Sequence, residues 1–145
     1  MSTQFAFWFI QGPGWLLVLY LVATQCVSAF SYDFGVRIGA QEPVEHTTRV
    51  GQAFWWGFAV GDLLFYVPVL ALGLIGQILG ASWAAPLLAA ALGITVYWPI
   101  VCLAAVRDAR GAPGWTPPNE APYWVVLPLI AAWALVGLVL LWLGG

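Results

Sequence analysis

Four long apolar runs constrain the fold of this chain more than any other feature. They cover residues 5–30, 53–79, 83–106 and 123–143, and each has the roughly 20 mainly apolar residues that a transmembrane helix needs. A membrane β-barrel would need many segments of about 10 residues with alternating polarity, which these runs lack. The chain is 63% hydrophobic and 7% charged, whereas soluble domains carry roughly 25% charged residues. We therefore expect a single transmembrane domain over residues 1–145, an all-α integral membrane four-helix bundle.

Prolines inside the runs are expected to bend the helices. Pro68, Pro99 and Pro128 each fall within an apolar run. Because proline has no N–H, the carbonyl one turn earlier loses its partner, and the helix is expected to kink there. A break is also expected at the Gln-Gly-Pro-Gly segment 11–14, so that the lipid-spanning part of the first helix begins at Trp15. Helices that bow apart in this way would leave an internal cavity.

The distribution of charge predicts the orientation in the membrane. The polar loops 31–52 and 107–122 lie on one side of a four-helix bundle and hold all the arginines: Arg37, Arg49, Arg107 and Arg110. The positive-inside rule puts both loops in the cytoplasm and both termini outside. The N-terminus lacks the basic segment of a signal peptide, so no cleavage is expected. The short chain without lysine suggests a multi-pass protein of the bacterial inner membrane, and the net charge of −2 argues against nucleic-acid binding.

Few residues could hold a metal or a cofactor. Glu45 and His46 are adjacent, so they would point in different directions on a helix, and no third ligand stands at a suitable spacing. Cys26 and Cys102 lie far apart within apolar runs, which is typical of small buried side chains rather than of a redox pair. We expect neither a metal site nor a cofactor.

Asp62 is the only charged residue between Arg49 and Arg107. A carboxylate near the centre of a bilayer costs about 2.5–3.5 kcal/mol on insertion scales, so such residues usually face a bundle interior and have a function. Asp62 could be a structural hydrogen-bond acceptor, an anchor for a cationic or hydroxyl group of a ligand, or a proton relay. No arginine lies within the four runs to neutralise it.

On a helix, Asp62 would lie on a face with aromatic side chains, and the neighbouring face would carry glycines. One helical stripe contains Trp55, Phe58, Asp62, Tyr66 and Val69. On the neighbouring face, Gly57 and Gly61 form a small-xxx-small step at which another helix could approach closely. This arrangement indicates a carboxylate that faces a cavity from a tightly packed helix.

Short segments in all four runs carry a resemblance to a known family. They are Trp-Leu-Leu-Val-Leu-Tyr at 15–20, Gly-Asp-Leu-Leu-Phe-Tyr-Val-Pro at 61–68, Tyr-Trp-Pro-Ile at 97–100 and Ala-Pro-Tyr-Trp-Val-Val-Leu-Pro at 121–128. With these segments, the chain resembles the EXPERA family of four-helix membrane proteins, which includes the sigma-2 receptor and the emopamil-binding protein. The resemblance covers most of the chain and is closest to the sigma-2 receptor branch.

The resemblance implies a ligand site. In that family, an acidic residue near the end of the first helix and another in the second helix line a central cavity that opens toward lipid and accepts sterols or amphiphilic amines. Asp33 and Asp62 are the matching positions. The isomerase branch uses a histidine within its helices, whereas His46 lies in a loop. This difference argues against sterol isomerase chemistry, but a membrane lipid or sterol isomerase-like activity, with Asp62 shuttling a proton, stays an open alternative.

We expect the protein to bind a small lipophilic ligand (sterol-like, a lipid or an amphiphilic amine) in an intramembrane cavity, with Asp62 as the polar anchor. The expected ligand-binding residues are Asp33, Asp62, Tyr66, Thr95, Tyr97 and Trp98. Two other functions stay open. One is a small proton-coupled transporter, a homodimer through Gly57 and Gly61, and the other is an accessory subunit of a membrane complex. The expected partners are membrane lipid and the small ligand.

Overall fold

The computed structural model describes residues 3–39, 41–112 and 120–144, and this part of the chain is helical without strands. The elements are α1 (Thr3–Phe30), α2 (Tyr32–Arg37), a 3₁₀ turn (Val44–His46), α3 (Arg49–Gly61), a π-helical turn (Asp62–Tyr66), α4 (Val67–Ile78), α5 (Ala84–Asp108) and α6 (Ala121–Gly144). Residues 113–119 of the expected loop 107–122 lie outside the described residues.

Four helical stretches are long and apolar enough to cross a membrane. They span 27, 30, 25 and 24 residues: Gln4–Phe30, Arg49–Ile78, Ala84–Asp108 and Ala121–Gly144. Large apolar side chains such as Leu64 and Trp142 point outward, with exposed fractions of 76% and 82%. A chain this small cannot bury so much apolar surface against itself, and lipid is the solvent that accepts it. The expectation of an all-α bundle with four helices of membrane-spanning length is confirmed.

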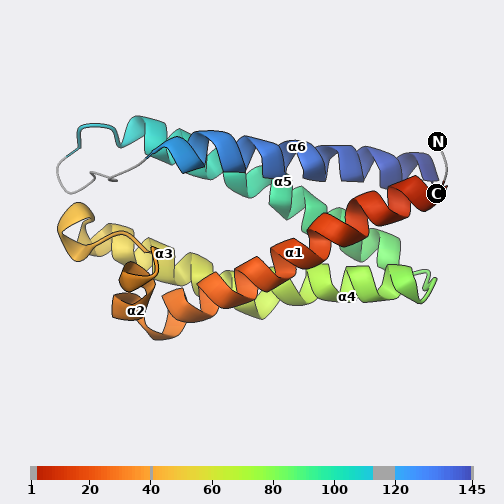
Figure 1. The fold of residues 1–145 in the computed structure, drawn as a ribbon, viewed down its shortest axis with the longest axis horizontal. Coiled ribbons are helices and arrows are strands. Elements are labelled where there is room, and N and C mark those ends of the chain that lie inside the picture. The colour runs from red at the N-terminus through yellow and green to blue at the C-terminus, as the bar shows by residue number, and fades with distance from the viewer. Residues whose placement is uncertain (1–2, 40, 113–119, 145) are drawn as a thin grey trace.

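In Figure 1, α6 lies along one side of the bundle and the continuous stretch from α3 to α4 along the other, while α1 and α5 run diagonally between them. α5 packs mainly on α6 and α4, whereas α1 contacts α3, α4 and α6. Figure 1 shows α1 crossing from the end of the bundle where both termini lie to the end where α2 lies. At the α2 end, α3 packs on α1 and makes at most slight backbone contact with α5 and α6.

The sharp turn between α4 and α5 has a clear sequence cause. Gly80 adopts a positive φ of 64°, which glycine reaches without a Cβ clash. The amides of Gly80 and Ala81 donate to the carbonyls of Gln77 and Gly76 at 3.2 and 2.9 Å. These two bonds form a Schellman motif that ends α4 and lets α5 fold back along it.

The expected break at residues 11–14 is wrong, because α1 continues through Pro13. Pro13 cannot donate to the carbonyl of Phe9, but the Trp133 indole on α6 donates to that carbonyl at 2.9 Å. The buried Gln11 side chain donates to the Leu74 carbonyl at 3.0 Å and so joins α1 to α4. The polar segment is therefore a site of contact between helices rather than an interruption.

The second membrane-length stretch starts earlier than expected and contains an irregular turn. Thr48 caps α3, because its hydroxyl oxygen accepts the amide of Gly51 at 3.1 Å. A π-helical turn then covers Asp62–Tyr66, immediately before Val67 and Pro68. π-turns of this kind are frequent at functional sites and change which residues share a face. By contrast, α5 and α6 run without interruption through their internal prolines.

Candidate functional site

A cavity of about 130 Å³ lies at the α2 end of the bundle, between α1, α3, α5 and α6. The cavity lies where α3 packs against α1 and makes at most slight backbone contact with α5. Its polar lining comes from Tyr20, Thr24, Gln25, Ser28, Gln41, Glu42 and Tyr123. Its apolar lining comes from Leu21, Gly39, Trp55, Phe58, Trp98 and Cys102. Such a mixture of aromatic walls and a few polar groups is typical of ligand sites.

One polar wall of the cavity comes from α1 and is supported by the following segment. Thr24, Gln25 and Ser28 all line the cavity from α1. Ser28 follows Thr24 by four residues and Gln25 by three, the spacings at which side chains are neighbours on a helix. The Ser28 hydroxyl donates to the Thr24 carbonyl at 2.8 Å, and the Gln41 amide donates to the Ser28 hydroxyl at 2.6 Å. Gln41 thereby ties the segment after α2 to the mouth of the cavity. The hydroxyl of Ser28 and the amide of Gln41 are therefore held in place by hydrogen bonds within the chain.

Gln25 connects the cavity to the membrane carboxylate. Its side chain lines the cavity, and its Nε2 donates to Asp62 Oδ2 at 2.9 Å. An ionised carboxylate can only accept, so Asp62 fixes the NH₂ end of this amide toward itself. The Gln25 carbonyl oxygen is then the end of the amide that is left for other donors. Asp62 itself is 9% exposed and does not line this cavity.

Glu42 brings an ionisable carboxyl to the cavity from the segment between α2 and the 3₁₀ turn. Burial raises the pKa of this carboxyl, and the nearby His46 and a side-chain hydrogen bond with Tyr123 oppose that rise. The Tyr32 hydroxyl donates to the Glu42 backbone carbonyl at 2.7 Å and so holds the segment against α2. Glu42 therefore adds an ionisable group to the lining of the cavity.

A second buried polar contact lies outside the cavity. The hydroxyls of Tyr66 and Thr95 are 2.5 Å apart, and the Thr95 hydroxyl donates to the Ala91 carbonyl at 2.7 Å. Because the Thr95 proton goes to that carbonyl, the Tyr66 hydroxyl is the donor in the short contact. Tyr66 and Thr95 are 6% and 2% exposed. Their contact joins the π-turn to α5, which is a structural role.

The structure does not gather the six expected site residues into one place. Trp98 lines the cavity, whereas Tyr97 is 67% exposed on the outer surface of α5. Tyr97 and Trp98 therefore face different surroundings, although they are neighbours in the sequence. Asp33 lies exposed in α2, and it is absent from the cavity lining. Asp62 reaches the cavity only through Gln25.

The sequence interpretation missed several residues that the structure brings to the cavity, above all Gln25, Glu42 and Tyr123. A signal for Gln25 was present, since Thr24, Gln25 and Ser28 interrupt an apolar run with polar side chains on one helical face. Glu42 had no such signal. Its place at the cavity depends on how the segment after α2 folds back.

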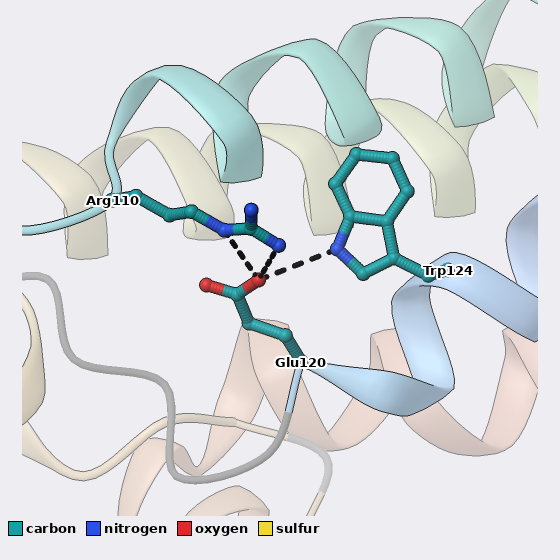
Figure 2. A network of polar contacts seen from close by, with 3 residues as sticks. All are labelled: Arg110, Glu120 and Trp124. Carbon is teal, nitrogen blue, oxygen red and sulfur yellow. Dashed lines mark hydrogen bonds and ion pairs between the residues drawn. The ribbon is translucent and has the colours of Figure 1, made fainter.

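A polar network joins the ends of α5 and α6 on the same side of the bundle (Figure 2). Arg110 Nη2 lies 2.5 Å from Glu120 Oε2, and the Trp124 indole donates to the same oxygen at 3.3 Å. The guanidinium also lies 5.5 Å from the centre of the Trp124 ring. The hydrogen bond from Arg110 lowers the pKa of Glu120. This network clamps the two helix ends and is exposed to solvent.

Within the described residues, no three His, Cys, Asp or Glu side chains are close enough to hold a metal ion. The sequence matches no protein-family model, and no curated protein or solved structure proved similar to it. The resemblance to the EXPERA family therefore stays a prediction.

Proposed function

We propose that the protein binds a small amphiphilic ligand, with the polar head in the cavity between α1, α3, α5 and α6. The observation that carries this proposal is a polar cavity inside a bundle whose outer surface is apolar. Polar groups within a membrane bundle are costly and are usually retained for a function. We propose that the protein is a ligand-binding membrane protein of the EXPERA type.

The size of the cavity limits what it encloses. Pockets that bury a whole drug-sized ligand measure about 300–1,000 Å³, and a cavity of about 150 Å³ accepts a benzene ring. The cavity of about 130 Å³ therefore holds a head group or a single ring. A sterol-like or long-chain body has to lie elsewhere.

An apolar groove between α1 and α6 offers room for that body. It has a volume of about 330 Å³ and is lined by Pro13, Leu16, Leu17, Tyr20, Val126, Leu129, Ile130 and Trp133. Tyr20 lines both this groove and the cavity, so the two spaces adjoin. We propose that the apolar part of the ligand lies in the groove while its head passes Tyr20 into the cavity.

The charge of the lining favours a cationic or hydrogen-bond-donating head, such as an amine. Glu42 is the only acidic or basic side chain among the lining residues apart from weakly acidic tyrosine and cysteine. The Gln25 carbonyl oxygen, oriented by Asp62, adds an acceptor. In this proposal, Glu42 meets the charge directly and Asp62 acts as a positioning residue.

Two further parts of the interpretation belong to the same proposal. We place the protein in a bacterial inner membrane, with the α2 end in the cytoplasm, because the arginines gather at that end. We also propose that the second membrane helix bends near Pro68, since a π-turn precedes it and the proline lacks an N–H.

The test compares probes that share one tail and differ in the head. An alkyl amine, its neutral alcohol and its sulfate are titrated against the protein in nanodiscs, and each probe is made in two forms, with a photoreactive group beside the head or in the tail. Glu42→Gln should weaken the affinity for the amine probe by about 10-fold or more, since hydrogen bonds to charged groups are worth roughly 1.5–3 kcal/mol. The control Glu45→Gln changes an exposed carboxyl of the same segment and should leave affinity unchanged.

Cross-linked peptides provide the second measurement. The head-proximal label should fall on the α1 segment around Gln25, and the tail label on the α1–α6 groove. Equal affinity for amine and sulfate, or equal loss in both glutamate variants, would remove the cavity from the proposal.

The pH dependence gives an independent check on Glu42. A quaternary ammonium probe keeps its charge at every pH, so its binding should weaken as the pH falls and the Glu42 carboxyl takes up a proton. Burial raises the pKa of this carboxyl, so the midpoint should lie above that of an ordinary glutamate. Glu42→Gln should abolish this titration, and His46→Gln controls for the neighbouring imidazole. A midpoint below the ordinary value contradicts the proposed environment.

A further inference from the structure

A second hollow lies on α3 and shares Phe58 with the lining of the ligand cavity. It has a volume of about 650 Å³ and runs from Arg49 past Ala53 and Gly57 to Gly61 and Asp62. A Cβ placed on Gly57 or Gly61 would meet no atom within 4 Å, so no other part of the described chain fills this space. Phe54 and Phe58 form its walls. We call this hollow the α3 groove.

We propose that the α3 groove binds one acyl chain of an anionic phospholipid, with the phosphate against Arg49. The length of the groove supports this occupant. Twelve residues separate Arg49 from Gly61, which is about 18 Å along a helix. The hydrocarbon of one leaflet is about half of the roughly 30 Å bilayer core. The groove therefore has the depth of a single acyl chain that enters from one surface.

The charge at the mouth of the groove supports a phosphate. Arg49 is exposed, and the one ion pair that the described residues form is between Arg110 and Glu120. The 30 residues from Arg49 to Ile78 extend about 45 Å, which matches a bilayer with its head groups. Arg49 thus lies at head-group depth, where a guanidinium can hold phosphate oxygens through two parallel hydrogen bonds.

The same charges disfavour a second copy of the chain as the occupant. Two parallel copies packed face to face through Gly57 and Gly61 would bring their Arg49 side chains together. Among the groove residues, the one acid is Asp62, which lies at the opposite end and whose Oδ2 accepts from Gln25 of α1. A lipid phosphate neutralises Arg49, whereas a second Arg49 repels it.

Native mass spectrometry of the detergent-solubilised protein tests the proposal, with titrations of dioleoyl phosphatidylglycerol and dioleoyl phosphatidylcholine. We expect one phosphatidylglycerol to bind more tightly than phosphatidylcholine. Arg49→Gln should reduce that preference by about fivefold, the effect of one cation near an anionic lipid surface. Arg37→Gln, which changes an exposed arginine at the same end of the bundle, should keep the preference.

Filling the groove provides the second variant. Gly57→Leu should weaken the binding of both lipids. Gly93→Leu on α5, where a Cβ also meets open space, should leave the binding of both unchanged. Equal binding of the two lipids by the unchanged protein, or equal effects of the two arginine variants, overturns the proposal. A loss of dimer rather than of lipid in Gly57→Leu would show that a second copy occupies the groove.

Discussion

Gln25 and Asp62 should be energetically coupled through their hydrogen bond, and the substitution Gln25→Leu tests this coupling. Leucine is an apolar side chain of roughly similar size to glutamine. The substitution therefore mainly removes the amide that donates to Asp62 Oδ2 at 2.9 Å. Asp62 is 9% exposed, so little water can replace the lost donor. The carboxylate would then be left without its partner on α1.

Two effects set the magnitude of this loss. A hydrogen bond to a charged group is worth roughly 1.5–3 kcal/mol in soluble proteins. In membrane proteins, measured couplings average about 0.6 and reach about 1.7 kcal/mol, because the unfolded chain in the membrane also finds partners. Since the acceptor is a carboxyl oxygen of a residue that is 9% exposed, we expect a value at the upper membrane limit, about 1.5 kcal/mol. This corresponds to roughly a 10-fold change in the unfolding equilibrium.

The assay is a double-mutant cycle in mixed micelles, with unfolding by dodecyl sulfate followed by tryptophan fluorescence. Gln25→Leu and Asp62→Leu are measured singly and together, and Gln52→Leu on α3 controls for adding a leucine in place of a half-buried glutamine. In the Asp62→Leu background, Gln25→Leu should cost much less stability than it does in the unchanged protein, because its partner carboxyl group is already absent. A coupling below about 0.3 kcal/mol would refute the inferred bond, since it falls under the average for membrane hydrogen bonds.

Three further predictions concern the rest of the bundle. Tyr66→Phe should cost about 0.6–1.7 kcal/mol in the same assay, because the contact with Thr95 is lost while the threonine keeps its backbone acceptor. Gly73→Ala should cost about 1–3 kcal/mol, since the new Cβ would lie 3.1 Å from a backbone nitrogen of α5, whereas Gly93→Ala should be neutral or stabilising. In an NMR titration, Glu120 should ionise below the ordinary glutamate pKa. Its stabilising contribution is therefore present at neutral pH and is lost as the pH falls through that lowered value; an ordinary midpoint would contradict the network in Figure 2.

Polar residues in the apolar runs show how far the sequence could predict the site. Asp62 was recognisable as a buried carboxylate with a need for a partner, and it is buried. Its partner, Gln25, is 37 residues away on another helix, so no local pattern could identify the pair. The same holds for the carbonyl of Phe9, which Pro13 leaves free and which Trp133 satisfies from 124 residues along the chain.

The sequence by itself determined that this protein is a bundle of helices long and apolar enough to span a membrane, because helix length and hydropathy are local quantities. Tertiary structure decided where that bundle is open. The cavity depends on α3 leaning toward α1, and Glu42 reaches it because the segment after α2 folds back. Period and spacing specify which residues share a helical face, but the packing of one helix on another specifies which face encloses a space.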